Sequence, residues 1–182
     1  MSPDSPAGPQ PPPLRPAEEF ADRAAEVLDT ERRRLAALGV PGELVLVGGC
    51  SVPGALTRGD VDLHLRVPPT AFAAALAALR ADHPVVHPEI WGPTLATFEI
   101  PAPVPAGLAV TPAGSEHDLR FTRTWQLLAA DPGLLAEYDA VKREGDGPAD
   151  EVAYEQRKSA FFDRLLARWP TSPASGSATG SS

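Results

Sequence analysis

The chain has 182 residues, of which 43% are hydrophobic and 22% charged, enough for one globular domain with a buried core. Pro, Gly, Arg or Asp interrupts every apolar run before the roughly 20 residues that a membrane span needs, so no contact with a membrane is expected. Cys50 is the only cysteine, which excludes an internal disulfide and a cysteine-based zinc site. The formal net charge of -8 argues against nucleic acid as a partner and favours a small molecule.

The two ends of the chain differ in composition from the middle. Seven of the 22 prolines lie in residues 1–16, and residues 170–182 contain only Pro, Thr, Ser, Ala and Gly. Neither composition can bury a core, so disordered tails are expected over 1–16 and 170–182, with one domain over 17–169. The first residues show no features of a signal peptide, so a cytoplasmic location is expected.

The first half of the domain alternates between helical and extended patterns. An apolar stripe at helical spacing predicts a helix over 17–38, closed by glycine and proline. A short β-favouring run predicts a buried strand over 43–47 that enters a turn of two glycines. Residues 60–67 alternate strictly and predict a strand with one polar face, and the alanine-rich segment 69–81 predicts a helix.

The second half is predicted to begin with short strands and to end in helices. Proline interrupts the extended segments, which suggests edge strands over 84–87, 94–100 and 107–111. Helical patterns separated by Asp-Pro and by Gly-Asp-Gly-Pro follow over 115–130, 132–143 and 150–169. The chain is therefore expected to end in a cap of helices.

The most informative segment joins the glycine turn to the alternating strand. Gly48 and Gly49 leave their backbone N–H groups open to a ligand, and successive N–H groups in such a turn can bind a phosphate. Asp60 and Asp62 point the same way from one strand, and a hard dication such as Mg²⁺ relieves the repulsion between neighbouring carboxylates. The alternative is an ordinary solvated strand face. Metal and phosphate together favour displacement at phosphorus.

These motifs resemble two known protein groups. The Gly-Gly turn followed by Asp60-Val61-Asp62 is similar to the signature of the polymerase-beta-like nucleotidyltransferase superfamily. Further stretches resemble the GrpB family of predicted nucleotidyltransferases, and they are Ser51-Val52-Pro53-Gly54, Gly114-Ser115-Glu116-His117-Asp118, Leu135-Ala136-Glu137-Tyr138 to Lys142, and Tyr154 to Lys158 with Phe161. The resemblance implies an α+β fold: a small mixed sheet, flanking helices and a C-terminal helical cap. It also implies Mg²⁺ or Mn²⁺ on Asp60 and Asp62, and the phosphates of a nucleoside triphosphate on the Gly48-Gly49 turn.

Two positions depart from the superfamily pattern. A serine often follows the first glycine, whereas this chain has Gly49 there, so a hydroxyl contact to phosphate would come from Ser51. Active members usually carry a third carboxylate on a later strand, and Glu99 is the candidate here for completing the site.

Other residues near these motifs have two interpretations. Arg58, Lys142 and Lys158 are candidate contacts to a triphosphate, although lysines also lie along apolar helix faces for structural reasons. Cys50 belongs to the glycine turn and is expected to be a buried thiol more often than a nucleophile. His64 is a possible ligand or a hydrogen-bonded neighbour, and His117 and Asp118 fit helix capping.

Two hypotheses for the function follow. The first is a Mg²⁺-dependent nucleotidyltransferase that moves a nucleoside monophosphate from a nucleoside triphosphate to a small-molecule acceptor, with Asp60, Asp62 and Glu99 as catalytic residues. The second is a noncatalytic module that binds a nucleotide, a phosphate or a protein partner on a degenerate nucleotidyltransferase fold. Turnover with release of pyrophosphate separates the two.

Overall fold

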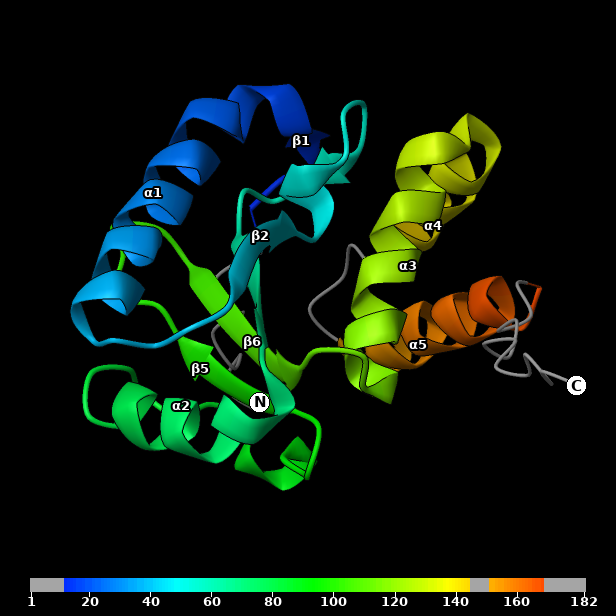
Figure 1. Cartoon of the computed structure of the whole chain (residues 1–182). Helices are drawn as coiled ribbons and strands as arrows, with labels where there is room; N and C mark the ends of the chain where they lie inside the picture. The colour runs from blue at the N-terminus through cyan, green and yellow to red at the C-terminus, as the bar shows by residue number, and fades with distance from the viewer. Residues whose placement is uncertain (1–11, 145–150, 169–182) are drawn as a thin grey trace, which may run out of the picture.

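A computed structural model describes residues 12–144 and 151–168 (Figure 1). Its helices are α1 (Ala21–Ala37), α2 (Phe72–Leu79), α3 (Glu116–Ala130), α4 (Pro132–Glu144) and α5 (Glu151–Ala167). Its strands are β1 (Arg15–Pro16), β2 (Glu43–Val47), β3 (Leu56–Thr57), β4 (Val61–Val67), β5 (Ala96–Glu99) and β6 (Ala106–Pro112). The α+β class with a small mixed sheet, flanking helices and a C-terminal group of helices is therefore confirmed.

The main sheet has four strands in the order β2-β4-β6-β5. β4 and β6 are parallel, and both outer strands run antiparallel to their neighbours. The register places Val47, Asp62, Gly107 and Glu99 in one row across the four strands. Residues directly opposite one another in a sheet point to the same face, so this row fixes which side chains share a face with Asp62.

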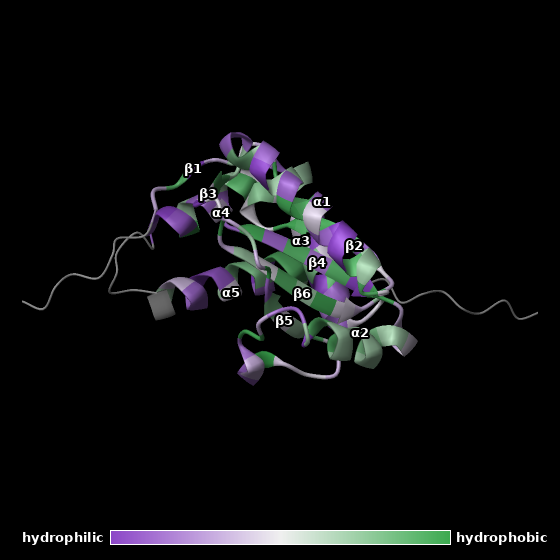
Figure 2. Cartoon of the chain, turned by 90° about the vertical axis from the view of Figure 1, so that its left-hand side faces the viewer, coloured by the Kyte–Doolittle hydropathy of each residue, from purple (hydrophilic) through white to green (hydrophobic). Residues whose placement is uncertain are grey.

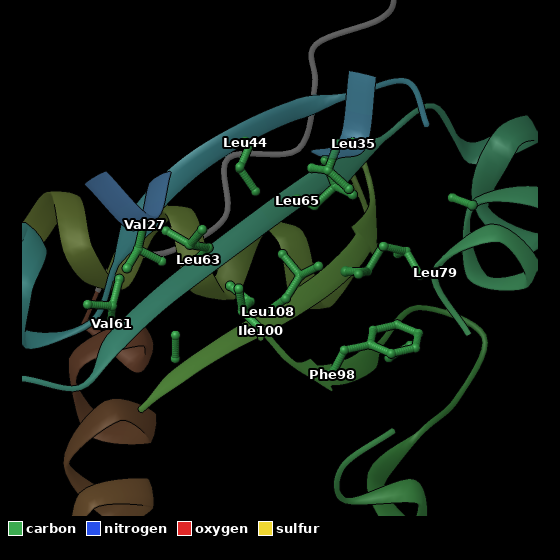
Figure 3. Packing of buried hydrophobic residues seen from close by; sticks show 14 of the residues in the cluster. Val27, Leu35, Leu44, Val61, Leu63, Leu65, Leu79, Phe98, Ile100 and Leu108 are labelled. Atoms are coloured by element: carbon green, nitrogen blue, oxygen red, sulfur yellow. The ribbon is translucent and has the colours of Figure 1, made fainter. Parts of the chain in front are cut away.

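One face of the sheet forms the main core. Figure 3 shows the apolar side chains of β4 packed with residues of α1, α2 and the neighbouring strands. Val61, Leu63, Leu65 and Val67 are at most 1% exposed, which confirms the predicted alternation of β4. In Figure 2, β4 and β6 are mostly hydrophobic, whereas α1 mixes hydrophilic and hydrophobic residues along its length.

The opposite face of β4 is polar but covered by α3. Arg66 donates from Nε to Asp118 over 2.6 Å and from a terminal nitrogen over 3.1 Å, and Asp118 is fully buried. His64 is also fully buried, bonded to Thr111 over 2.8 Å, and burial lowers its pKa to about 4. The side chain of Ser115 caps α3 by accepting from the Asp118 N–H, so Asp118 both lies in the cap and anchors the helix to the sheet.

A second, smaller core holds the C-terminal helices together. It contains aromatic and aliphatic residues of α3, α4 and α5, with Tyr138 stacked on Phe161 at a ring separation of 5.5 Å. Trp125 completes the aromatic cluster, with its ring edge-on to those of Tyr138 and Phe162. The predicted helical cap is thus a packed unit that lies beside the sheet in Figure 1.

The segment before α1 lies along the loop that leads to β4. Arg15 and Pro16 of β1 pair with Thr57 and Leu56 of β3, and Ala17 donates its N–H to Ala55 over 2.8 Å. The ring of Phe20 lies against Gly59, where an added Cβ would collide with it. We call residues 12–20 the N-terminal strap. The predicted tail over 1–16 is therefore ordered over its last five residues, and residues 1–11 lie outside the described part of the chain.

Two other expectations differ from the structure. Residues 84–87 form no strand, only an isolated bridge between Val85 and Phe98. The strand predicted over 60–67 begins at Val61, so Asp60 precedes it. The expected tail over 170–182 lies outside the described residues. No helix within residues 12–144 and 151–168 has the length and apolar character needed to cross a membrane.

Candidate functional site

Asp60 and Asp62 lie together at the start of β4. Asp60 is exposed, whereas Asp62 is half-buried inside the sheet row between Val47 and Gly107. Burial raises the pKa of Asp62 to about 6, the negative charge of Asp60 adds to this rise, and the positive charge of Lys158 opposes it. The two carboxylates therefore repel each other in a partly desolvated place, which is an environment that a cation stabilises.

Gly48 lies directly against Asp62. Its φ of 73° is favourable only for glycine, and an added Cβ would collide with the Oδ2 atom of Asp62. Gly107 lies on the other side, where an added Cβ would be 3.6 Å from Oδ1. The predicted neighbourhood of the glycine turn and Asp62 is therefore present, with glycines on both sides of the carboxylate.

The turn after Gly48 is a short 3-10 helix over Gly49–Ser51. Ser51 donates its hydroxyl proton to the carbonyl oxygen of Gly48 over 2.8 Å, so this hydroxyl shapes the turn. An added Cβ at Gly49 would lie 3.0 Å from the Cβ of Thr57 and 3.1 Å from its Oγ1. Thr57 thus fills the space that a serine side chain would need, which gives a physical reason for glycine at this position.

Cys50 is a buried structural residue. Its Sγ donates to the carbonyl oxygen of Asp60 over 3.1 Å and lies 3.7 Å from the Oγ1 of Thr57. Burial raises the pKa of the thiol, and the negative charges of Asp60 and Asp62 raise it further. Because the thiolate is the reactive form, this environment argues against a nucleophilic role. The thiol instead ties the glycine turn to the chain at Asp60.

Lys158 is the cation whose charge acts on Asp62. It lies on α5, forms an ion pair with Glu155 at 3.4 Å, and is 5.8 Å from the ring centre of Tyr154. Burial lowers the pKa of Lys158, but its interactions with Glu155, Tyr154 and Asp62 outweigh this effect, and the pKa is raised overall. Lys158 is therefore a cation of α5 that pairs with Glu155 and whose charge also acts on Asp62.

Arg58 lies in the loop between β3 and β4. It is half-buried and donates from Nε to the carbonyl oxygen of Pro12 in the strap over 3.1 Å. Its positive charge lowers the pKa of the Tyr154 hydroxyl, although burial, the larger effect, raises that pKa. Arg58 therefore joins the loop before β4 to the strap and carries a positive charge that acts on Tyr154 of α5.

Lys142 is buried, with 4% of its surface exposed. Its Nζ donates to the carbonyl oxygen of Leu56 and to Oδ1 of Asp139, the second over 3.2 Å, and lies 4.1 Å from the ring centre of Tyr138. The amine predicted to contact phosphate is thus directed at groups of the protein.

Glu99 lies on the sheet face of Asp62 but apart from it. It is exposed, and Gly107 separates the two residues in the row across the sheet. With neighbouring strands about 4.8 Å apart, two strand steps separate the backbones of Glu99 and Asp62 by about 10 Å. Within residues 12–144 and 151–168, no group of three or more His, Cys, Asp or Glu side chains comes together to hold a metal.

The residues present fit a divalent cation only in part. Asp60 and Asp62 supply carboxylate oxygens, which Mg²⁺ prefers, and the pKa of Asp62 is raised first by burial and then by the charge of Asp60, two effects that a bound cation would offset. Mg²⁺ needs about six oxygen ligands, so phosphate oxygens of a substrate and water would supply the others. The site is therefore suited to a cation that arrives with a phosphate ligand.

Asp139 is a residue of this region that the sequence reasoning missed. Its carboxylate is buried and accepts the Leu56 N–H at both oxygens, over 3.1 and 3.3 Å. The sequence did carry a signal for it. Asp139 lies three residues before Lys142 in a predicted helix, a spacing at which opposite charges can form an ion pair.

The structure thus combines a small mixed sheet, a carboxylate pair with Asp62 on the internal strand β4 and Asp60 just before it, and a glycine turn beside Asp62. The sequence matches the model of the GrpB protein family over residues 16–168, so the chain belongs to the GrpB family. The crystal structure of the conserved protein GrpB from Enterococcus faecalis is similar, with a TM-score of 0.55 and 11% identity, covering 79% of this chain and 94% of that one. This likeness concerns the fold.

Two further solved structures with a similar fold are named as a poly(U) polymerase and a poly(A) polymerase. The Cid1 poly(U) polymerase bound to MgGTP matches with a TM-score of 0.49 and 15% identity, covering 71% of this chain and 43% of Cid1. The structure of the noncanonical poly(A) polymerase complex GLD-2–GLD-3 matches with a TM-score of 0.47 and 15% identity. The match covers 74% of this chain and 48% of the matched chain. Among curated proteins, no sequence matches this chain.

Proposed function

We propose that this protein is a Mg²⁺-dependent nucleotidyltransferase that transfers a nucleoside monophosphate from a nucleoside triphosphate to a small-molecule acceptor. The observation that carries the proposal is the contact between Gly48 and the carboxylate of Asp62, beside Asp60 and in the field of Lys158. A phosphate-binding turn, a pair of carboxylates and a cation are the groups needed to bind and polarise a triphosphate.

In the proposed mechanism, Asp60 and Asp62 hold Mg²⁺, which supplies Lewis-acid stabilisation of charge on the phosphate oxygens. The backbone of the turn over Gly48, Gly49, Cys50 and Ser51 binds the β and γ phosphates, and Lys158 and Arg58 offset their negative charge. An acceptor hydroxyl or amine attacks the α phosphorus, the bond to the bridging oxygen breaks, and pyrophosphate leaves. Glu99 is the candidate base that takes the acceptor proton, since it is exposed on the same sheet face as Asp62.

The second candidate is a nucleotide- or phosphate-binding protein without turnover. It is favoured by one observation, the presence of Gly107 rather than a carboxylate beside Asp62 on β6. With Asp60 and Asp62 as its two carboxylates, the site would bind one metal ion together with the nucleotide. It would lack a third carboxylate to activate the acceptor. Glu99 decides between the two candidates, because only the transferase needs it.

Calorimetry of nucleotide binding tests the proposal. ATP, GTP, CTP and UTP are titrated into the protein with and without Mg²⁺, and into the double variant Asp60→Asn/Asp62→Asn. The matched control is Asp22→Asn/Asp29→Asn, which removes the same charge from two exposed positions of α1. We expect Mg²⁺-dependent binding that is retained in the control and lost in the site variant. Binding that is equal in both variants would contradict the assignment of the site.

A turnover assay then separates the two candidates. Pyrophosphate release is measured across small-molecule alcohols and amines, with the wild type and the Glu99→Gln variant. Release that depends on an acceptor and falls in Glu99→Gln supports a transferase. Tight Mg²⁺-dependent binding without release for any acceptor, and unchanged in Glu99→Gln, supports the binding protein.

A further inference from the structure

Two side chains of helix α4 form hydrogen bonds with both backbone groups of Leu56 in β3. The N–H of Leu56 donates to both carboxylate oxygens of Asp139, and the carbonyl oxygen of Leu56 accepts from the amine of Lys142. The amine and the carboxylate also bond to each other over 3.2 Å. Asp139 and Lys142 thus form a clamp, the Asp139–Lys142 clamp, that fixes the position of Leu56 along the chain.

A short series of contacts runs from this clamp to the carboxylates. Thr57, the next residue, accepts the N–H of Gly59 over 3.1 Å at its Oγ1. The carbonyl oxygen of Asp60 accepts from the thiol of Cys50, which lies in the glycine turn. Leu56 is four residues before Asp60, and the hydrogen bonds of Thr57 and Asp60 restrain the short backbone between them.

Both side chains of the clamp are charged and buried, and packing alone would be served equally well by apolar side chains. Lys142 is 4% exposed and Asp139 is 6% exposed. A buried ion pair is often no more stabilising than apolar residues of the same volume, so stability alone does not account for this pair. What the pair supplies that apolar side chains cannot is two directed bonds to one backbone residue.

We propose that Asp139 and Lys142 are positioning residues, which hold Leu56 so that Asp60 and Asp62 stand at the spacing needed for a metal-bound triphosphate. The role rests on the proposed function, because it is defined by the binding of that ligand. It assigns Lys142 an indirect part in nucleotide binding. The clamp also joins α4 of the helical cap to β3, the strand before the loop that carries Asp60.

Two variants and one control test the clamp. Lys142→Met keeps the length of the side chain and removes its donors, and Asp139→Asn keeps an acceptor for the Leu56 N–H while removing the charge. The matched control is Leu79→Ala, which perturbs the fully buried contact of α2 with the main core, away from β3. Lys142→Arg serves as the conservative replacement, since it restores donors and charge.

Nucleotide affinity is measured under conditions where circular dichroism shows each variant to be folded. We expect Mg²⁺–triphosphate binding to weaken at least tenfold in Lys142→Met, to weaken less in Asp139→Asn, and to recover in part in Lys142→Arg. Leu79→Ala is expected to remain within twofold of the wild type. Equal losses in Leu79→Ala and Lys142→Met, or affinity within twofold of wild type in Lys142→Met, would overturn the proposal.

Hydrogen exchange separates a failure of this proposal from a failure of the proposed function. The exchange of backbone amides over 54–62 is measured by mass spectrometry in the absence of nucleotide. We expect it to accelerate at least tenfold in Lys142→Met and to stay unchanged in Leu79→Ala. If the wild type binds no triphosphate, the proposed function fails while this measurement still decides whether the clamp orders the loop. Unchanged exchange in Lys142→Met and in Asp139→Asn refutes the clamp whatever the ligand.

Discussion

Replacing Asp62 by asparagine is expected to stabilise the metal-free protein and to abolish metal binding. The native carboxylate is half-buried beside a second carboxylate, and both features raise its pKa. A residue whose pKa is higher in the folded than in the unfolded protein binds protons more tightly when folded. Its stabilising contribution is therefore complete at low pH and is lost as the pH rises through the folded pKa.

The magnitude follows from the two pKa values. The ordinary value is 3.8 and the folded value about 6. Since one pKa unit corresponds to about 1.4 kcal/mol, ionised Asp62 costs up to about 3 kcal/mol in the folded protein. Asparagine has the same shape without the charge. The free energy of unfolding of Asp62→Asn should therefore exceed that of the wild type by up to about 3 kcal/mol at pH 8 and by only about 0.5 kcal/mol at pH 4.

Urea unfolding in EDTA, followed by circular dichroism at pH 4, 6 and 8, measures this difference. Adding Mg²⁺ with a triphosphate should then stabilise the wild type and leave the variant unchanged, because only the wild type binds the pair. Asp22→Asn is the control, since it removes one carboxylate charge from an exposed position of α1 outside the site. A variant that is no more stable than the wild type at pH 8 would refute the reasoning about Asp62.

Three further predictions concern the structure around the site. Gly48→Ala forces a Cβ against Asp62 at a backbone conformation reserved for glycine, so we expect a loss of roughly 1–3 kcal/mol in urea unfolding and loss of Mg²⁺–nucleotide binding in calorimetry. His64 has its pKa lowered from 6.5 to about 4 by burial, so stability should fall by up to about 3 kcal/mol as the pH drops from above 6.5 to 4, and this fall should disappear in His64→Gln. Arg66→Ala leaves the buried carboxylate of Asp118 without its main partner and should cost about 3 kcal/mol in the same assay, partly recovered in the double variant with Asp118→Asn.

The sequence predicted the elements whose patterns depend on nearby residues. The alternation of β4 is visible in four apolar residues at every second position, and all four are buried in the core. The neighbourhood of Gly48 and Asp62 was also foreseeable, because a turn of two glycines and a strand of paired carboxylates need little more than local geometry. Both features come from residues less than 20 positions apart.

Features that depend on distant parts of the chain were missed or only half seen. The polar face of β4 was expected from its residue types. The burial of His64 against Phe121 and the pairing of Arg66 with Asp118 depend on how α3, about 50 residues later in the chain, packs on the sheet. Lys142 was a candidate contact to a triphosphate, with a structural role as the alternative, and in the structure its amine donates to the backbone carbonyl of Leu56. Every residue has a backbone carbonyl, so the sequence does not indicate which one accepts a hydrogen bond from a distant lysine.

The N-terminal strap has a practical consequence for anyone who shortens this chain. Its proline-rich composition invites removal up to Ala17, where the helical pattern starts. Such a cut would take away the partner strand of Leu56 and Thr57 and the carbonyl oxygen that Arg58 bonds. A truncated protein that fails to bind nucleotide would then report a damaged loop rather than an inactive family member, and a safer boundary lies before Pro12.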